Sequence, residues 1–261
     1  RRYASKDEAP RHYIDIDHYG DNPFDAVPKR YDSAVAKFSE DTLIAYGTSP
    51  WHINKMYYWL RKAFFEKDRD KILRLSAEIG HYIGDAHVPL HTTENYNGQL
   101  TNQKGIHGFW ESRLPELFAE SYNYTLPKAR YIDDPLERIW IAIEESHAAL
   151  DSVLSFEKEL TESTKEGGKY AHEERGVTIV KTYSREFSKN YHTMLSGMVE
   201  RRMRKAMHCI GSFWYSAWID AGQPDLNDLV NDEASKEYLK TIDDEKKTWK
   251  RGKWLGRPEE E

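Results

Sequence analysis

The amino-acid sequence predicts an all-α protein that forms a single multi-helix domain. Apolar residues recur three and four positions apart through most of the chain, and Ser, Asp and Pro residues mark several helix starts. The 261 residues are 39% apolar and 31% charged, so the chain is long enough to bury one large core. We therefore expect residues 1–261 to pack as one helical domain with short loops.

The first part of the chain predicts one extended segment followed by helices. Residues 12–18 alternate apolar and charged side chains, which is typical of a short extended segment. Asp32 is expected to cap a helix that continues to Gly47. Ser49 and Pro50 then open the next helix, with Ser as the N-cap and Pro at the first helical position.

The third predicted helix begins at Asp68 or Asp70 and ends before Pro89. Its core stripe consists of four apolar residues at helical spacing, which are Ile72, Leu75, Ile79 and Ile83. His81 and Asp85 project from the opposite side of this helix.

The remainder of the chain predicts three further helices. They are expected over residues 107–120, 135–160 and 178–220. The charged stretch 162–174 is expected to be a mobile connection, and the tail 245–261 is expected to fray. Four basic residues in the last long helix are expected to face solvent, namely Arg201, Arg202, Arg204 and Lys205.

Composition narrows the classes of function. The formal net charge is −6, so bulk attraction to nucleic acid or to an anionic membrane is not expected. The single cysteine, Cys209, excludes an intrachain disulfide. No run of 18 apolar residues predicts a transmembrane segment, and no signal peptide is recognisable. Because the sequence begins at Arg1 rather than Met, we expect a mature or truncated form.

Histidines and carboxylates gather between positions 81 and 111. His81 and Asp85 are four residues apart, as are His107 and Glu111, and His91 lies between the two pairs. Residues four apart share one face of a helix, so each pair can bind one metal ion. A single pair of this kind is more often an exposed ion pair, but two pairs together with His91 predict a metal site. Ligands of this type without Cys favour zinc at a site that stays open to water or substrate.

Several His–carboxylate clusters in one cleft are suited to phosphodiester hydrolysis. Paired metal ions generate hydroxide near neutral pH, orient the phosphate and stabilise the leaving oxygen. The main rival is a di-iron bundle, whose signature is Glu-x-x-His on two helices. This chain has His-x3-Asp and His-x3-Glu instead, which favours zinc.

The stretch His81-Tyr-Ile-Gly-Asp-Ala-His-Val-Pro-Leu-His91, followed by His107-Gly-Phe-Trp-Glu111, resembles a known family signature. Bacterial zinc-dependent phospholipases C and fungal single-strand-specific zinc nucleases share this signature. Tyr13-Ile14-Asp15 and, less closely, Pro50-Trp51-His52 also resemble the family. The resemblance extends over residues 11–120. It implies an all-α fold, a trinuclear zinc site and an exported enzyme, either periplasmic or extracellular.

The family pattern implies that side chains of this chain hold zinc. The first ion would be bound by Asp15, His52, His81 and Asp85. The second would be bound by His91, His107 and Glu111. Asp85 would bridge to a third zinc, and Asp15 would orient or deprotonate the attacking water. His87 matches a position that supports a ligand through a hydrogen bond.

The sequence departs from the family pattern at its N-terminus. The family holds its third zinc with an N-terminal Trp and a His soon after it, whereas this chain begins Arg1-Arg2-Tyr3 and has its first histidine at His12. The resemblance therefore predicts that this chain lacks the family's leading segment. It also predicts that the chain binds two or three zinc ions.

The resemblance leaves the phosphodiester substrate open between phospholipid and single-stranded nucleic acid. The short spacing within the second ligand set and the presence of Glu111 favour a phospholipase C. Against this, Ile16 and Ser49 replace the aromatic residues of a choline pocket, while Ile53 replaces the base-stacking residue of a nuclease. The nearest alternative is a single-strand nuclease of the same fold, and a third possibility is an inactive helical metal-binding or interaction module.

Overall fold

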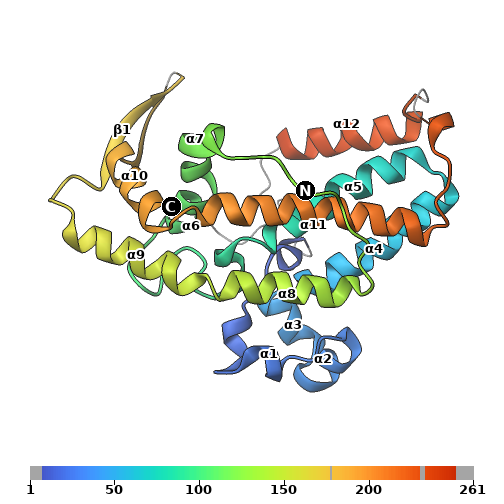
Figure 1. Ribbon diagram of the computed structural model, residues 1–261, viewed down its shortest axis with the longest axis horizontal. Helices are drawn as coiled ribbons and strands as arrows, with labels where there is room; N and C mark the ends of the chain where they lie inside the picture. Colours follow the sequence, from blue (N-terminus) through green and yellow to red (C-terminus); the bar gives the residue numbers. More distant parts are fainter. Residues whose placement is uncertain (1–7, 177, 230–232, 251–261) are drawn as a thin grey trace.

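The computed structural model describes residues 8–176, 178–229 and 233–250, and within them the chain is all-α apart from one antiparallel hairpin (Figure 1). The prediction of the fold class is therefore confirmed. The α-helices are α1 (Pro23–Ala26), α2 (Tyr31–Phe38), α3 (Glu40–Tyr46), α4 (Ser49–Glu66), α5 (Arg69–Asp85), α6 (Ile106–Gly108), α7 (Leu114–Phe118), α8 (Pro135–His147), α9 (Leu150–Ser163), α10 (Arg185–Met194), α11 (Met198–Asp220) and α12 (Lys236–Lys250).

Shorter elements connect these helices. The 3-10 turns are η1 (Ala9–His12), η2 (Ile16–Tyr19), η3 (Pro89–Thr92), η5 (Ala119–Ser121) and η6 (Asn227–Leu229). The segment η4 (Phe109–Arg113) is a π-helical turn between α6 and α7. The strands β1 (Tyr170–Arg175) and β2 (Thr178–Tyr183) pair with Tyr170 opposite Tyr183.

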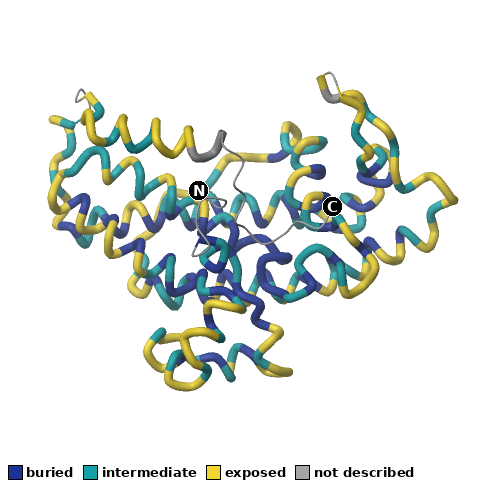
Figure 2. The backbone as a smooth tube through the Cα atoms, turned by 180° about the vertical axis from the view of Figure 1, so that it is seen from behind, coloured by how far each residue is buried: buried dark blue, intermediate teal, exposed yellow. Residues whose placement is uncertain are grey.

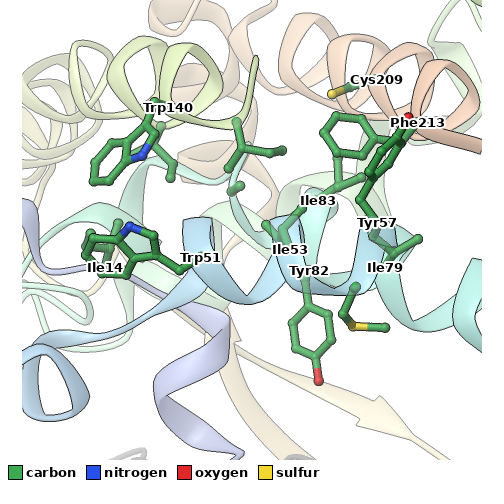
Figure 3. Packing of buried hydrophobic residues seen from close by; sticks show 14 of the residues in the cluster. Ile14, Trp51, Ile53, Tyr57, Ile79, Tyr82, Ile83, Trp140, Cys209 and Phe213 are labelled. Atoms are coloured by element: carbon green, nitrogen blue, oxygen red, sulfur yellow. The ribbon is translucent and has the colours of Figure 1, made fainter. Parts of the chain in front are cut away.

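The main core lies where α4 packs against α5, α8 and α11. Ile53, Ile83 and Phe213 are among its fully buried side chains (Figure 3). The buried parts of the chain gather at the centre of the molecule, while exposed residues lie mainly on the outer helices (Figure 2). Within the described residues, no helix combines the length and the apolar character that a membrane span requires.

A second apolar cluster contains buried residues of the segment that follows α5, including Leu90 and Phe109. The Phe109 ring stacks on the Tyr183 ring with centroids 3.8 Å apart, and it also stacks on the Tyr191 ring. The helix α11 contributes Val199 to this cluster and Phe213 to the main core, so one continuous helix ties the two clusters together.

The predicted starts of the second and third helices are confirmed. α4 begins at Ser49 with Pro50 in its first turn, but the N-cap is Thr48 rather than the predicted Ser49, and its side chain makes no capping hydrogen bond. α5 begins after Asp68, whose side chain accepts a hydrogen bond from the Lys71 amide (3.1 Å) and so caps the helix. Ile79 and Ile83 of the predicted stripe are fully buried.

Three predicted long helices are divided, so those predictions were wrong in extent. The helix expected over 178–220 is divided into α10 and α11, with Gly197 at a positive φ of 75° before α11. The helix expected up to Gly47 breaks at Ser39, which has a positive φ of 72° and caps α3 by accepting from the Thr42 amide. The helix expected over 135–160 breaks between α8 and α9. Ile143 of α8 packs in the main core, whereas Val153 of α9 packs in the second cluster, so the chain must turn between them.

Two further local predictions are corrected by the structure. The segment 12–18 is extended only in part. Tyr13 has an extended backbone, but His12 ends the 3-10 turn η1 and residues 16–18 lie in η2, where the His18 amide donates to the Asp15 carbonyl (3.1 Å). Residues 178–183 form strand β2 rather than the start of a helix. β2 is rich in β-branched residues, namely Thr178, Ile179, Val180 and Thr182, and such side chains fit a pleated hairpin better than a helix.

The basic cluster and the C-terminal tail also differ from expectation. Arg202 is buried rather than solvated (6% exposed). Its guanidinium donates to the carbonyls of His87 (2.9 Å) and Ala142 (3.0 Å). The helix α12 covers residues 245–250 of the predicted tail, and Glu245 pairs with Arg74 of α5 (2.8 Å). Residues 251–261 lie outside the described part of the chain.

The burial of Cys209 yields a first testable prediction. Burial raises the pKa of the Cys209 thiol to about 11, and the thiolate is the form that reacts. We expect a chromogenic disulfide reagent at pH 8 to label Cys209 more than about 100-fold more slowly in the native protein than in denaturant. Equal rates in the two states would contradict the buried position of this side chain in α11.

Candidate metal centre

The structure brings histidines and carboxylates together in two groups. The first group contains His12 of η1 with His81 and Asp85 of α5. The second contains His91 of η3, His107 of α6 and Glu111 of the π-helical turn, which are the three residues that the resemblance implied for the second ion. In each group every residue offers one ligand atom, and these three atoms lie within 4.8 Å of one another. Each group can therefore hold a metal ion.

The first group joins two segments that are far apart in the sequence. His12 Nδ1 lies 2.8 Å from Asp85 Oδ2 and 3.2 Å from His81 Nε2. His81 Nε2 is 3.5 Å from the same carboxylate oxygen. His81 and Asp85 share one face of α5 because they are one helical turn apart, and η1 places His12 across from them.

The second group is assembled around the π-helical turn. The Leu114 amide donates to the Phe109 carbonyl, five residues back. Pro115 has no amide hydrogen to offer the Glu111 carbonyl, so a regular α-helix cannot continue there. Turns of this type are frequent at functional sites. Here the turn carries Glu111 with its Oε2 atom 2.8 Å from His107 Nε2.

Backbone carbonyls orient both histidines of the second group. The contact of His91 Nδ1 with the His12 carbonyl (2.7 Å) and that of His107 Nδ1 with the Tyr96 carbonyl (3.1 Å) require an N–H at Nδ1. Each Nε2 faces Glu111, with His107 Nε2 2.8 Å and His91 Nε2 3.5 Å from the carboxylate. In the neutral ring this nitrogen carries the lone pair that can bind a metal ion. This arrangement is typical of metal-binding histidines.

One short stretch of backbone links the two groups. The His12 side chain belongs to the first group, while the His12 carbonyl holds His91 of the second. The Ile14 amide also donates to the His91 carbonyl (3.0 Å). A groove of about 350 Å³ has His81 and Asp85 of the first group and Glu111 of the second in its wall, so one carboxylate of each group borders the same space.

The ionised carboxylates of the two groups favour positive charge on or beside the neighbouring imidazoles. Burial alone would lower the pKa of His12, but a hydrogen bond to Asp85 and the negative charge of the nearby Glu8 raise that pKa above its ordinary value. Burial alone would raise the pKa of Glu111, but His107 and His91 outweigh it and hold that pKa well below its usual range. Ionised carboxylates beside imidazoles are the electrostatic setting in which a cation is stabilised.

Two residues that the resemblance assigned to the first zinc lie elsewhere. In the described residues, neither group includes Asp15 or His52. Asp15 is buried (1% exposed), and its backbone amide donates to the Tyr46 carbonyl (2.7 Å). The His52 ring packs edge-on against Tyr82 with centroids 4.7 Å apart, and burial lowers the pKa of His52 to about 4. The zinc-binding roles of Asp15 and His52, and the catalytic role of Asp15, stay predictions.

His87 joins neither group, and within the described part of the chain its ring makes no hydrogen bond to a residue of either group. Its contact through Nδ1 with the Ile83 carbonyl (2.7 Å) requires an N–H there, and its own carbonyl accepts from Arg202. Because the side chain is buried, the pKa of His87 falls to about 3, so the ring is neutral.

The residue that the sequence pattern missed is His12. Its partners in the first group lie 69 and 73 positions away, so no local spacing connects them. A signal was nevertheless present. Glu8 and His12 are four residues apart, the same carboxylate–His spacing as in the other two pairs.

The fold and the site together define an all-α protein with two adjoining His–carboxylate groups that can hold metal ions. No protein-family model matches this chain, and no curated protein or solved structure matches it significantly. Its function must therefore be inferred from the residues themselves.

Proposed function

We propose that this protein is a zinc-dependent phosphodiesterase of the phospholipase C type. The observation that carries the proposal is the pair of adjoining groups, His12/His81/Asp85 and His91/His107/Glu111, whose carboxylates border one groove. The resemblance of the segment His81–Glu111 to zinc-dependent phospholipases C and zinc nucleases supports the same function. By that resemblance the protein would act as an exported enzyme.

The residues of both groups fit zinc. Each group offers two imidazoles and one carboxylate, with Cys absent, which is a ligand set that zinc accepts while keeping a position open. His91 Nε2 is buried and makes no hydrogen bond within the described part of the chain, although it faces Glu111. A bound cation would satisfy this nitrogen.

The chemistry of the proposed reaction follows from the ligand set and the groove. Zinc held there would supply a Lewis acid that polarises a phosphoryl oxygen and makes water acidic enough to attack near neutral pH. The carboxylates of Asp85 and Glu111, in the groove wall, would orient a water through hydrogen bonds. The Nδ1–H bonds of His91 and His107 to backbone carbonyls keep both rings aligned for that purpose.

The groove favours an ester with an apolar group. Its wall also includes Trp110 and the α11 side chains Val199, Met203 and Met207. Methionine side chains adapt to irregular apolar ligands. A net charge of −6 gives no general attraction for nucleic acid. These features favour phospholipid over single-stranded nucleic acid as the substrate.

The function can be tested on the purified chain. We expect about two zinc ions per chain by mass spectrometry of metals, with EDTA-sensitive hydrolysis of bis(4-nitrophenyl) phosphate. Phosphatidylcholine and single-stranded DNA then distinguish the two substrate classes. Faster turnover of the DNA would assign the nuclease function instead. Firm zinc binding without turnover of any phosphodiester would indicate an inactive metal-binding module.

A further inference from the structure

A buried carboxylate lies directly behind the first group of ligands. Glu8, just before η1, is only 7% exposed. Its Oε1 atom lies 3.7 Å from His12 Nε2, on the side of the ring that faces away from Asp85. Among the described residues, His12 Nε2 makes no hydrogen bond. The imidazole therefore lies between two carboxylates, with Asp85 at Nδ1 and Glu8 at Nε2.

Two further side chains fix the position of Glu8. The Tyr82 hydroxyl donates to Glu8 Oε1, and Arg11 Nη1 donates to Oε2 (2.8 Å). Tyr82 follows His81 on α5, and its ring packs against the His12 ring with centroids 5.0 Å apart. Its hydroxyl points away from the apolar core (Figure 3). Tyr82 thus connects the helix that carries His81 and Asp85 to the carboxylate behind His12.

We propose that Glu8 is a positioning residue that orients His12 for metal binding through Nδ1. A carboxylate that faces the distal N–H of a metal-binding imidazole fixes the orientation of the ring and makes the ligating nitrogen more basic. At 3.7 Å the contact is an ion-pair distance rather than a hydrogen bond, so Glu8 acts on His12 mainly through its charge. This inference rests on the proposed zinc site.

The test uses Glu8→Gln, which removes the charge but keeps an acceptor for Tyr82. Zinc itself is the probe, and its affinity is measured by competition with a chromophoric chelator. We expect one of two bound ions to be held 10- to 100-fold more weakly, a range typical for loss of such a supporting group. The second ion should be held as before, because His91 and His107 are oriented by backbone carbonyls.

The matched control is Glu94→Gln. Glu94 also pairs with a histidine, His18 (3.4 Å), but this pair is partly exposed and outside both groups. The Glu94→Gln variant should therefore bind both zinc ions with unchanged affinity. Tyr82→Phe, which removes the hydroxyl behind Glu8 and keeps the ring, should weaken the same ion by a smaller factor. This second variant carries the test if Glu8→Gln does not fold.

The outcomes separate this inference from the proposed function. Unchanged affinity for both ions in Glu8→Gln would overturn the positioning role while leaving phosphodiester hydrolysis intact. Equal weakening of both ions, or a lower melting temperature of the metal-free variant, would show general structural damage and would also overturn it. Selectively weaker binding of one zinc ion, in a protein without hydrolytic activity, would support the positioning role of Glu8 and refute the proposed phosphodiesterase function.

Discussion

Replacing Glu111 with Gln is expected to lower kcat/KM for phosphodiester hydrolysis by about 10³-fold. Glu111 is the carboxylate shared by His91 and His107. Its loss removes negative charge where a metal ion would be bound. Metal-ion catalysis contributes several kcal/mol to transition-state stabilisation, and about 1.4 kcal/mol corresponds to each factor of ten in rate. Steady-state kinetics on bis(4-nitrophenyl) phosphate, with metal analysis after dialysis, would measure both effects.

Glu116→Gln provides the matched control for this prediction. Glu116 follows on the next helical turn and pairs with Arg113 (3.2 Å), but it belongs to neither group. Turnover and metal content of this variant should match those of the unsubstituted protein. If Glu111→Gln also kept full turnover and zinc content, the second group would not be a metal site.

Replacing Arg202 with Met is expected to lower the free energy of unfolding by about 3 kcal/mol. The Arg202 guanidinium donates to the His87 and Ala142 carbonyls and to the Ser146 hydroxyl. Methionine fills similar space but leaves the His87 carbonyl without its donor, whereas the Ala142 carbonyl still accepts from the Ser146 hydroxyl (2.8 Å). A buried acceptor left unsatisfied costs about 1–3 kcal/mol. Chemical denaturation would measure the total loss in the free energy of unfolding.

Lys205→Met tests whether this effect depends on burial. Lys205 pairs with Glu145 (2.9 Å), as Arg202 does (3.1 Å), but the Lys205 side chain is half exposed. Exposed ion pairs contribute at most about 1 kcal/mol, so this variant should remain close to the unsubstituted protein. Equal destabilisation by the two substitutions would mean that charge, rather than buried hydrogen bonding, stabilises this part of α11.

The positions of His81, Asp85, His107 and Glu111 show how far local spacing can predict a site. Each pair lies within one helical turn, so the sequence distance fixes the spatial distance. His12 shows the limit of that reasoning. It reaches His81 only because η1 packs against α5, and that contact depends on the whole core.

Helix ends show the same division between local and tertiary causes. The start of α5 follows from its N-cap, since the Asp68 side chain accepts a hydrogen bond from the Lys71 amide three residues on. The break between α8 and α9 has no comparable local signal. It arises because Ile143 and Val153 pack in different apolar clusters, and only the packed structure defines those clusters.

Local sequence patterns are sufficient to predict the all-α class, the core stripe of α5 and the two His–carboxylate pairs. These features depend on residues one helical turn apart, and the helix supplies their geometry. The tertiary structure alone decided that His12 joins the first group, that Arg202 is buried and that Glu8 lies behind a candidate ligand. Each of these depends on contacts between distant segments, whose energy is realised only when the helices pack together.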